Sequence, residues 1–147
     1  LHRKKVRQFI VTSSSRKQVE LLVKHLFKDF NPFEFIISSD DVRFHKPNPL
    51  PYLRAIKLSG IDIYNTVVFE DSNAGLKSSL SASLPTIYIP SNIPTVIDEK
   101  IKLDCILDSL GDDKIMANVI KGPKIKKKFV DYTFLNNYLL SISHAKN

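Results

Sequence analysis

The sequence has little of the features that define several large protein classes. Only one cysteine, Cys105, occurs in 147 residues, so an internal disulfide framework is excluded. A reducing compartment, the cytoplasm or a plastid stroma, is the expected location. No stretch approaches the roughly 20 apolar residues of a membrane-spanning helix, so we expect no membrane partner. Hydrophobic residues make up 43% of the chain and charged residues 25%, which is typical of a globular domain with a buried core.

The net charge of +7 comes largely from two basic stretches, residues 3–7 and 121–128. Such stretches attract nucleic acids, acidic membranes or anionic substrates. Neither contains the interleaved aromatic residues that stack on single-stranded bases. We therefore interpret both as solvated surface and expect no nucleic-acid partner, while basic nucleic-acid binding remains the weakest alternative.

The chain begins with Leu1, and its only methionine is Met116. The absence of acidic residues before Glu20 is also a property of transit peptides. However, the basic start runs directly into an apolar segment of strand type, which favours an internal start. We therefore expect the sequence to be a fragment of a longer protein.

Segments of strand type and helix type alternate along the chain. The expected strands are 6–11, 33–38, 66–69, 85–89 and possible strand 103–107. The expected helices are 15–30, one that carries Leu53 and Ile56 and stops at Gly60, 73–82 and one from about 131. The first strand ends in the continuous apolar run Phe9-Ile10-Val11, as in sheets that are buried on both faces. This alternation predicts an α/β fold, with a parallel sheet flanked by helices. A partial core domain would cover residues 1–112, and a linker and closing helix residues 113–147.

Two helices carry patterns that predict their buried faces. Ser15 and Gln18 have the spacing of a capping box. An apolar stripe follows at helical spacing: Val19, Leu22, Val23, Leu26, Phe27 and Phe30. On the closing helix, the expected buried face consists of Tyr132, Leu135, Leu139 and Ile142. We expect the closing helix to pack on or beside the core.

Polar residues follow three of the expected strands. They are Thr12, Ser13 and Ser14 after the first, Lys46 in the loop after the second, and Glu70, Asp71 and Ser72 after the third. Ligands of parallel sheets bind at the carboxyl ends of the strands. Hydroxyl groups and an ammonium group bind phosphate oxygens, and carboxylates bind Mg²⁺. Taken singly, each group has a simpler interpretation as a helix cap, a solvated lysine or a helix start.

Three segments in this order resemble the haloacid dehalogenase superfamily, most closely its β-phosphoglucomutase-like subgroup. The segments are 9–16, 46–53 with its Lys46-Pro47-Asn48-Pro49 string, and 67–75 with its Glu70-Asp71-Ser72 string. They look like the second, third and fourth motifs of the superfamily, and the likeness covers about residues 6–110. The resemblance implies a Rossmann-like fold, of which this chain holds the C-terminal core part.

The resemblance also implies a role for each residue. Ser13, or alternatively Thr12, would bind the transferring phosphoryl group, with Ser14 nearby, and Lys46 would hold the same phosphate. Glu70 and Asp71 would position Mg²⁺, and Ser72 and Asn73 would support them. The implied activity is Mg²⁺-dependent hydrolysis of a small phosphorylated metabolite, such as a sugar phosphate. Catalysis would rest on positioning and on charge stabilisation.

The sequence departs from the family pattern in two ways. The first motif of the family, Asp-x-Asp-Gly-Thr, carries the nucleophile, and no Asp-x-Asp occurs in these 147 residues. The helical cap that follows that motif is missing too, so we expect this chain alone to be inactive. The second departure is Leu50, where the family has an acidic residue. A phosphomutase, or a truncated protein that binds phosphate or a partner without catalysis, remains an alternative. Because the missing strand is central in the family, we also expect exposed sheet edges and a loosely folded or poorly soluble chain.

Overall fold

The computed structural model describes residues 1–91 and 97–144. The helices are α1 (Arg16–Leu26), α2 (Leu50–Ser59), α3 (Asn73–Ser81) and α4 (Tyr132–His144). The strands are β1 (Phe9–Val11), β2 (Phe35–Ile37), β3 (Val68–Glu70), β4 (Thr86–Tyr88), β5 (Cys105–Leu107) and β6 (Val119–Lys121). Short 3-10 turns lie at η1 (His2–Lys4), η2 (Ser39–Asp41) and η3 (Ile63–Asn65). Within the described ranges, no helix is both long and apolar enough to cross a membrane.

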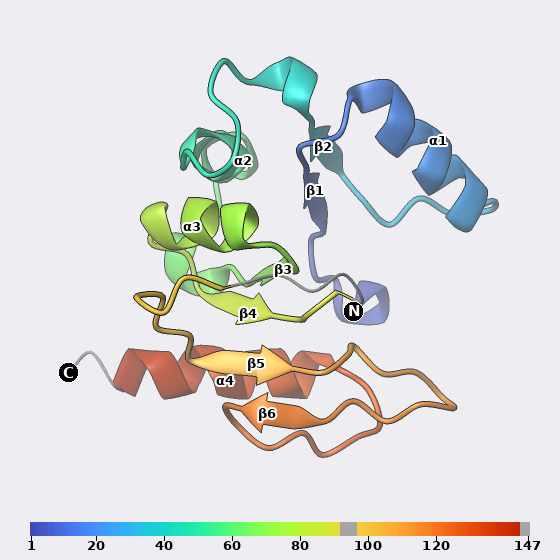
Figure 1. Cartoon of the computed structure of the whole chain (residues 1–147). Helices are drawn as coiled ribbons and strands as arrows, with labels where there is room; N and C mark the ends of the chain where they lie inside the picture. Colours follow the sequence, from blue (N-terminus) through green and yellow to red (C-terminus); the bar gives the residue numbers. More distant parts are fainter. Residues whose placement is uncertain (92–96, 145–147) are drawn as a thin grey trace.

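The strands form two separate sheets. β1 and β2 pair in parallel, with Ile10 opposite Ile36. β3, β4 and β5 form a second parallel sheet in that order, and β6 extends it as an antiparallel edge strand. Figure 1 shows β1 and β2 beside α1, and the larger sheet below α3. The predicted α/β fold with parallel sheets flanked by helices is confirmed.

Helices cover both faces of the larger sheet. On one face Ile87 packs in a buried cluster with Phe134 and Tyr138 of α4. On the other face Tyr88 packs with Leu76 of α3. Consecutive residues of a strand point to opposite faces, so a strand covered on both sides needs a continuous apolar run. This packing explains the apolar runs of the sequence.

A cavity of about 180 Å³ separates the two sheets. Its walls come from β1, from β3 and its approach, and from α2, and they are mainly apolar: Phe9, Val11, Tyr52, Ala55, Ile56, Ser59, Thr66, Val67, Val68, Phe69 and Leu84. We call this cavity the slot. No described strand pairs with the edges of β1 and β3 that border it. The expected incompleteness of the sheet is therefore visible as a gap between its two parts.

The termini of the first two helices follow the sequence. Ser15 and Gln18 form the predicted capping box at the start of α1, and the Ser15 amide donates to Gln18 Oε1 at 3.1 Å. α2 ends at Gly60, whose φ of 67° lies in the left-handed region that glycine adopts without strain.

The predicted core face of α1 is largely wrong. Val19 and Val23 are buried, but Leu22 is 56% exposed and Leu26 62% exposed, and Phe27 and Phe30 are exposed as well. The two-stranded sheet beside α1 offers a narrow surface, so only the centre of the stripe is covered.

The C-terminal segment also differs from the prediction. The buried face of α4 contains Phe134 and Tyr138 together with Leu135, whereas Tyr132, expected on that face, is 46% exposed. The short strand β6 was not predicted, because it is an exposed edge strand whose last residue, Lys121, begins the basic stretch. The boundary at residue 112 stays a prediction, although α4 packs in one cluster with β4 and β5.

Candidate functional site

A polar pocket of about 300 Å³ lies at the carboxyl ends of β1 and β3. It is lined by Val11, Thr12, Ser13, Ser14, Lys46, Phe69, Glu70, Asp71 and Ser72. Seven of the eight site residues predicted from the sequence thus lie together, and only Asn73 is outside this lining. Parallel β–α units bring these strand ends together because each strand ends at the same edge of its sheet.

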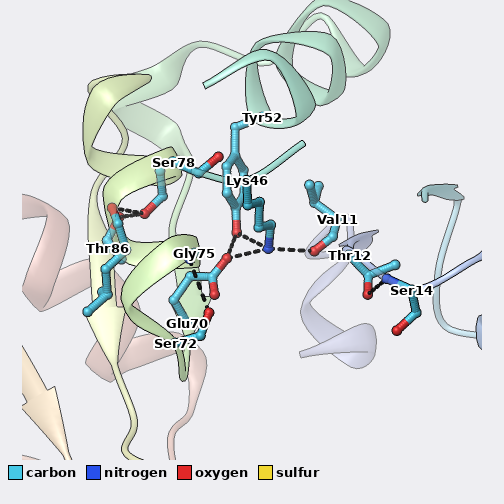
Figure 2. A network of polar contacts seen from close by, with 12 residues as sticks. Val11, Thr12, Ser14, Lys46, Tyr52, Glu70, Ser72, Gly75, Ser78 and Thr86 are labelled. Carbon is cyan, nitrogen blue, oxygen red and sulfur yellow. Dashed lines mark hydrogen bonds and ion pairs between the residues drawn. The ribbon is translucent and has the colours of Figure 1, made fainter. Parts of the chain in front are cut away.

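Lys46 connects the two sheets at this edge (Figure 2). Its Nζ donates to the carbonyl oxygen of Val11 in β1 at 3.0 Å, and lies 2.5 Å from Glu70 Oε1 at the end of β3. Both charged side chains are buried, with 8% of Lys46 and 5% of Glu70 exposed. A buried charge needs an opposite charge and hydrogen bonds, and Lys46 and Glu70 supply both to each other. The pair fixes Lys46 at the floor of the pocket.

Tyr52 is a third member of this network, and the sequence analysis gave it no role. Its hydroxyl donates to Glu70 Oε1 and lies 3.2 Å from Lys46 Nζ, whose ammonium is 4.9 Å from the centre of the Tyr52 ring. Burial and the neighbouring charge of Glu70 raise the pKa of Tyr52, so its hydroxyl stays protonated and keeps donating. The signal that could have revealed it is its place in the first turn of α2, shortly after Lys46.

Gly75 leaves the space that the Glu70 carboxylate occupies. A Cβ added at Gly75 would collide with Glu70 Oε2, so no side chain fits there without moving the carboxylate. The Gly75 amide donates to Ser72 Oγ at 3.1 Å, which caps the start of α3. The spacing of these residues therefore has two causes. Glu70 packs against Gly75, and Ser72 caps the helix through the Gly75 amide.

The loop that carries Lys46 is hydrogen-bonded to α3 and to the start of α2. Ser78 Oγ, buried in α3, donates to the carbonyl oxygen of Asn48 at 2.6 Å. Asn48 Oδ1 accepts from the Leu50 amide at 2.9 Å. Leu50 occupies the position where the family has an acidic residue. It is the first residue of α2, and its amide is hydrogen-bonded to Asn48.

The serine-rich turn after β1 forms the opposite wall. Thr12 Oγ1 accepts from the Ser14 amide at 3.1 Å, and Ser13 and Ser14 are exposed. The local bond orients the Thr12 hydroxyl within its own turn, whereas Ser13 is an exposed residue of the pocket lining. The choice between Ser13 and Thr12 as the phosphate ligand stays a prediction.

Asp40 and Asp41 hold this turn in place and do not line the pocket. Asp40 Oδ2 accepts from the Arg16 amide at 3.0 Å, and Asp41 pairs with the Arg16 guanidinium at 2.7 Å. Burial would raise the pKa of Asp41, but hydrogen bonds from Arg16 and Ser38 outweigh it and lower that pKa to about 2. These contacts give Asp40 and Asp41 a structural role in the turn.

Asn73 lies at the start of α3, next to Ser72. Its Oδ1 is buried and has no hydrogen-bond partner among the described residues. An unpaired buried acceptor costs about 1–3 kcal/mol of stability. A group outside the described chain that donates to this oxygen would remove that cost.

The described residues of the pocket supply only part of the ligands that a divalent cation needs. Glu70 and Asp71 supply carboxylates, but the described residues contain no group of three or more His, Cys, Asp or Glu side chains around one point. Glu70 Oε1 is already bonded to Lys46 and Tyr52. Mg²⁺ takes one or two carboxylates together with waters and phosphate oxygens, so the pair fits a shared site. Asp71, which is exposed, is the more accessible of the two.

Cys105 has no part in this site. It is completely buried on β5, and burial raises the pKa of its thiol to about 11. A thiol in that state is a poor nucleophile at neutral pH, as expected for a core residue.

The fold and the pocket together define an α/β protein with hydroxyl, ammonium and carboxylate groups gathered at the carboxyl ends of β1 and β3. The family model of haloacid dehalogenase-like hydrolases matches residues 1–89. This match covers more than half of the chain, and the chain belongs to that family.

Individual relatives agree with this assignment. Protein CbbY of Rhodobacter capsulatus is 36% identical over 88 residues, which are 58% of this chain and 39% of that protein. A phosphorylated carbohydrates phosphatase of Thermotoga maritima is 25% identical over 118 residues, which are 80% of this chain and 53% of that protein. The crystal structure of CbbY from Rhodobacter sphaeroides in complex with phosphate superimposes with a TM-score of 0.67 and 30% identity, over 74% of this chain and 48% of the other. The chain thus spans about half or less of the length of these relatives.

Proposed function

We propose that this chain is the core part of a Mg²⁺-dependent phosphatase that acts on small phosphorylated sugars. The observation that carries the proposal is the meeting of Ser13, Lys46 and Asp71 in one pocket between two sheet parts. Membership of the hydrolase family supports it, as do the names of relatives that act on phosphorylated carbohydrates. A fructose-1-phosphate phosphatase of Escherichia coli, 29% identical over 79 residues, points to the same substrate class.

In this proposal the residues of the chain bind and orient the phosphoryl group. Ser13 donates its hydroxyl hydrogen bond to one phosphate oxygen, Ser14 assists from the same turn, and Lys46 offsets the negative charge from the other side. Glu70 and Asp71 would hold Mg²⁺, which neutralises phosphate charge when it is bound. These contributions stabilise the transition state by preorganised electrostatics.

The nucleophile would come from outside the 147 residues. An aspartate carboxylate would attack phosphorus, the sugar alkoxide would leave and take a proton, and water would then hydrolyse the aspartyl phosphate. Lys46, which lies at the floor of the pocket, would face that aspartate as well as the phosphate. The chain by itself would then bind phosphate without turning it over.

Two alternatives use the same pocket. A phosphomutase would share every group named here and would differ in the acid/base group and the cap. A non-catalytic protein would retain phosphate binding alone. Both remain alternatives because the deciding residues are not in this sequence.

Sequencing the DNA upstream of the codon for Leu1 is the first test of the hypothesis that the longer protein is an enzyme. An in-frame Asp-x-Asp-Gly-Thr motif followed by a helical segment is the expected result. A start codon close upstream without that motif would leave only the binding protein.

Assays of the longer product then test the site. With sugar phosphates and Mg²⁺, we expect Asp71→Asn and Lys46→Ala to lower kcat/KM by at least about a hundredfold, as for loss of a charged transition-state contact. Asp113→Asn and Lys57→Ala are the matched controls, because both residues are exposed and remote from the pocket lining. Equal rates for Asp71→Asn and Asp113→Asn would contradict the assignment of the metal ligand. Accumulation of an isomeric sugar phosphate in place of free phosphate would favour the mutase.

A further inference from the structure

The two oxygens of the Glu70 carboxylate have different surroundings. Oε1 accepts hydrogen bonds from the Tyr52 hydroxyl and from the Lys46 ammonium. Oε2 accepts none from the residues that the structure describes, and it points away from Tyr52 (Figure 2). A carboxylate oxygen has two lone pairs, so the two donors occupy the acceptor capacity of Oε1. Oε2 is therefore the oxygen that remains for a further ligand.

Tyr52 has a fixed position from which it holds Oε1. The residue is 5% exposed and packs in a buried cluster with Val68 and Leu84. Its hydroxyl also accepts from Lys46 Nζ at 3.2 Å, so the hydroxyl, the ammonium and the carboxylate form a closed ring of hydrogen bonds. A closely packed tyrosine ring on a helix cannot follow a carboxylate that turns. If Glu70 turned, the hydroxyl would stay buried without its acceptor, which is unfavourable.

The start of α3 confines the same carboxylate from another side. Gly75 is buried, and the Glu70 carboxylate lies so close to it that an added Cβ would collide with both oxygens. The carboxylate is thus held between the backbone of α3 and the hydroxyl of Tyr52 on α2. Because it is confined by two helices, we expect it to keep one orientation when a ligand enters the pocket.

Magnesium and calcium place different demands on such a carboxylate. Mg²⁺ requires near-ideal octahedral geometry and keeps several waters, so one oxygen from each carboxylate suits it. Ca²⁺ is larger, takes about six to eight oxygen ligands in flexible geometry, and accepts both oxygens of one carboxylate. A glutamate that offers a single oxygen therefore suits Mg²⁺ and withholds a ligand from Ca²⁺.

We propose that Tyr52 is a positioning residue that makes the cation site selective for Mg²⁺ over Ca²⁺. By donating to Oε1 it limits Glu70 to one ligand oxygen, Oε2, while Asp71 supplies the other carboxylate. Without the hydroxyl, Oε1 keeps only the bond from Lys46 and gains capacity for a cation. This inference rests on the proposed function, because it concerns the cation site of the same pocket.

Ion binding to the full 147-residue chain tests the proposal without an activity assay. Magnesium chloride or calcium chloride is added to isotope-labelled protein, and the NMR shifts of the Asp71 and Ser72 amides give a dissociation constant for each ion. Tyr52→Phe keeps the aromatic ring and removes only the hydroxyl. In this variant we expect the ratio of the two constants to move toward Ca²⁺ by at least about fivefold, comparable to one net hydrogen bond. An unchanged ratio would overturn the proposal.

Tyr138→Phe is the matched control. It also removes one buried tyrosine hydroxyl that donates a hydrogen bond, in this case to the Thr86 carbonyl in the larger sheet. Tyr138 is not part of the pocket lining, so the variant should have the same ratio of dissociation constants as the parent chain. An equal change in both variants would show a general loosening of the fold and would contradict a specific role for Tyr52.

The hydroxyl proton of Tyr52 gives a second readout, which needs no variant. A buried hydroxyl that donates to a carboxylate exchanges slowly with water, so its proton signal is observable. With saturating Mg²⁺ in the parent chain we expect this signal to persist, because the cation binds Oε2. Its loss would show that Glu70 turns away from Tyr52 and would overturn this proposal alone. No shift of the Asp71 amide with either ion would overturn the magnesium site of the proposed function, and this proposal with it.

Discussion

The two sheets of this molecule have similarly apolar strands, but the extent to which their residues are buried differs. Around β3, β4 and β5, Leu76, Ile87 and Leu107 are completely buried, and helices cover both faces. Around β1 and β2, neither strand has more than partial burial except at Ile37, and much of the apolar stripe of α1 is exposed. Apolar periodicity predicts that a helix has an inner face, but the extent of burial depends on how much sheet lies opposite.

The difference extends to charged groups. The Lys46–Glu70 pair between the sheets is buried, whereas the Arg7–Glu34 pair just before the strands of the smaller sheet has 43% of each side chain exposed. Exposed pairs contribute little because water and salt screen them. The candidate site thus depends on the buried Lys46–Glu70 pair, which connects the well-packed larger sheet to the poorly packed smaller sheet.

Breaking this connection should have the largest effect on stability. Lys46→Ala leaves the Glu70 carboxylate buried without its cation, and we expect a loss of about 3–5 kcal/mol in the free energy of unfolding. Urea unfolding followed by circular dichroism measures it. The exposed control Lys57→Ala should be nearly neutral. A similarly small effect of Lys46→Ala would show that the pocket is wetter than the structure indicates.

A core substitution compares the two regions directly. Ile87→Ala, in the larger sheet, should cost about 2–5 kcal/mol because it removes buried methyl groups and leaves a cavity. Leu22→Ala, on the exposed face of α1, should change stability by less than about 0.5 kcal/mol. Equal losses for the two variants in urea unfolding would mean that α1 is covered in solution.

Acid should weaken the contact between Asp41 and Arg16 beside the smaller sheet. The pKa of Asp41 is lowered in the folded state to about 2, against 3.8 for an unperturbed group. Its stabilising contribution is therefore complete above about pH 4 and is lost as pH falls toward 2. Asp41→Asn should cost on the order of 1–2 kcal/mol at pH 7, a modest figure because 39% of the Arg16 side chain is exposed. In Asp41→Asn, the slope of stability between pH 4 and 2 should be shallower than in the parent, and an unchanged slope would exclude this pair as its cause.

A hydrogen bond in the larger sheet gives the smallest expected effect. The Tyr138 hydroxyl of α4 donates to the buried Thr86 carbonyl at 3.0 Å. Tyr138→Phe removes the donor and should cost about 1 kcal/mol. Tyr132→Phe, on the exposed side of the same helix, is the control. Thermal unfolding of both variants measures the difference, and equal transition temperatures would show that the bond contributes nothing.

Much of the fold followed from local sequence signals. The capping box of Ser15 and Gln18 and the stop at Gly60 were read correctly because they depend on neighbouring residues. The burial of α1 and the strand β6 were not, because both depend on which distant element lies opposite. Helix α4 was placed correctly, but its buried face was misjudged at Tyr132 for the same reason.

The candidate site shows the same division. Strand-end positions brought Ser13, Lys46 and Asp71 together as predicted, and their roles stay predictions. Tyr52 was missed because its contact with Glu70 joins α2 to β3, and a helical tyrosine gives no sign of such a contact. The direct ion pair between Lys46 and Glu70 was missed too, because both residues had been assigned to separate ligands.

The slot has a consequence for amide hydrogen exchange. Along β3, the Val68 amide is bonded to Pro85, while the neighbouring Phe69 amide faces the cavity. Exchange protection should therefore alternate from one residue to the next within a single strand, with Val68 slow and Phe69 fast. Such an alternation of exchange rates between neighbouring residues would identify the strand edge that has no partner among the described residues.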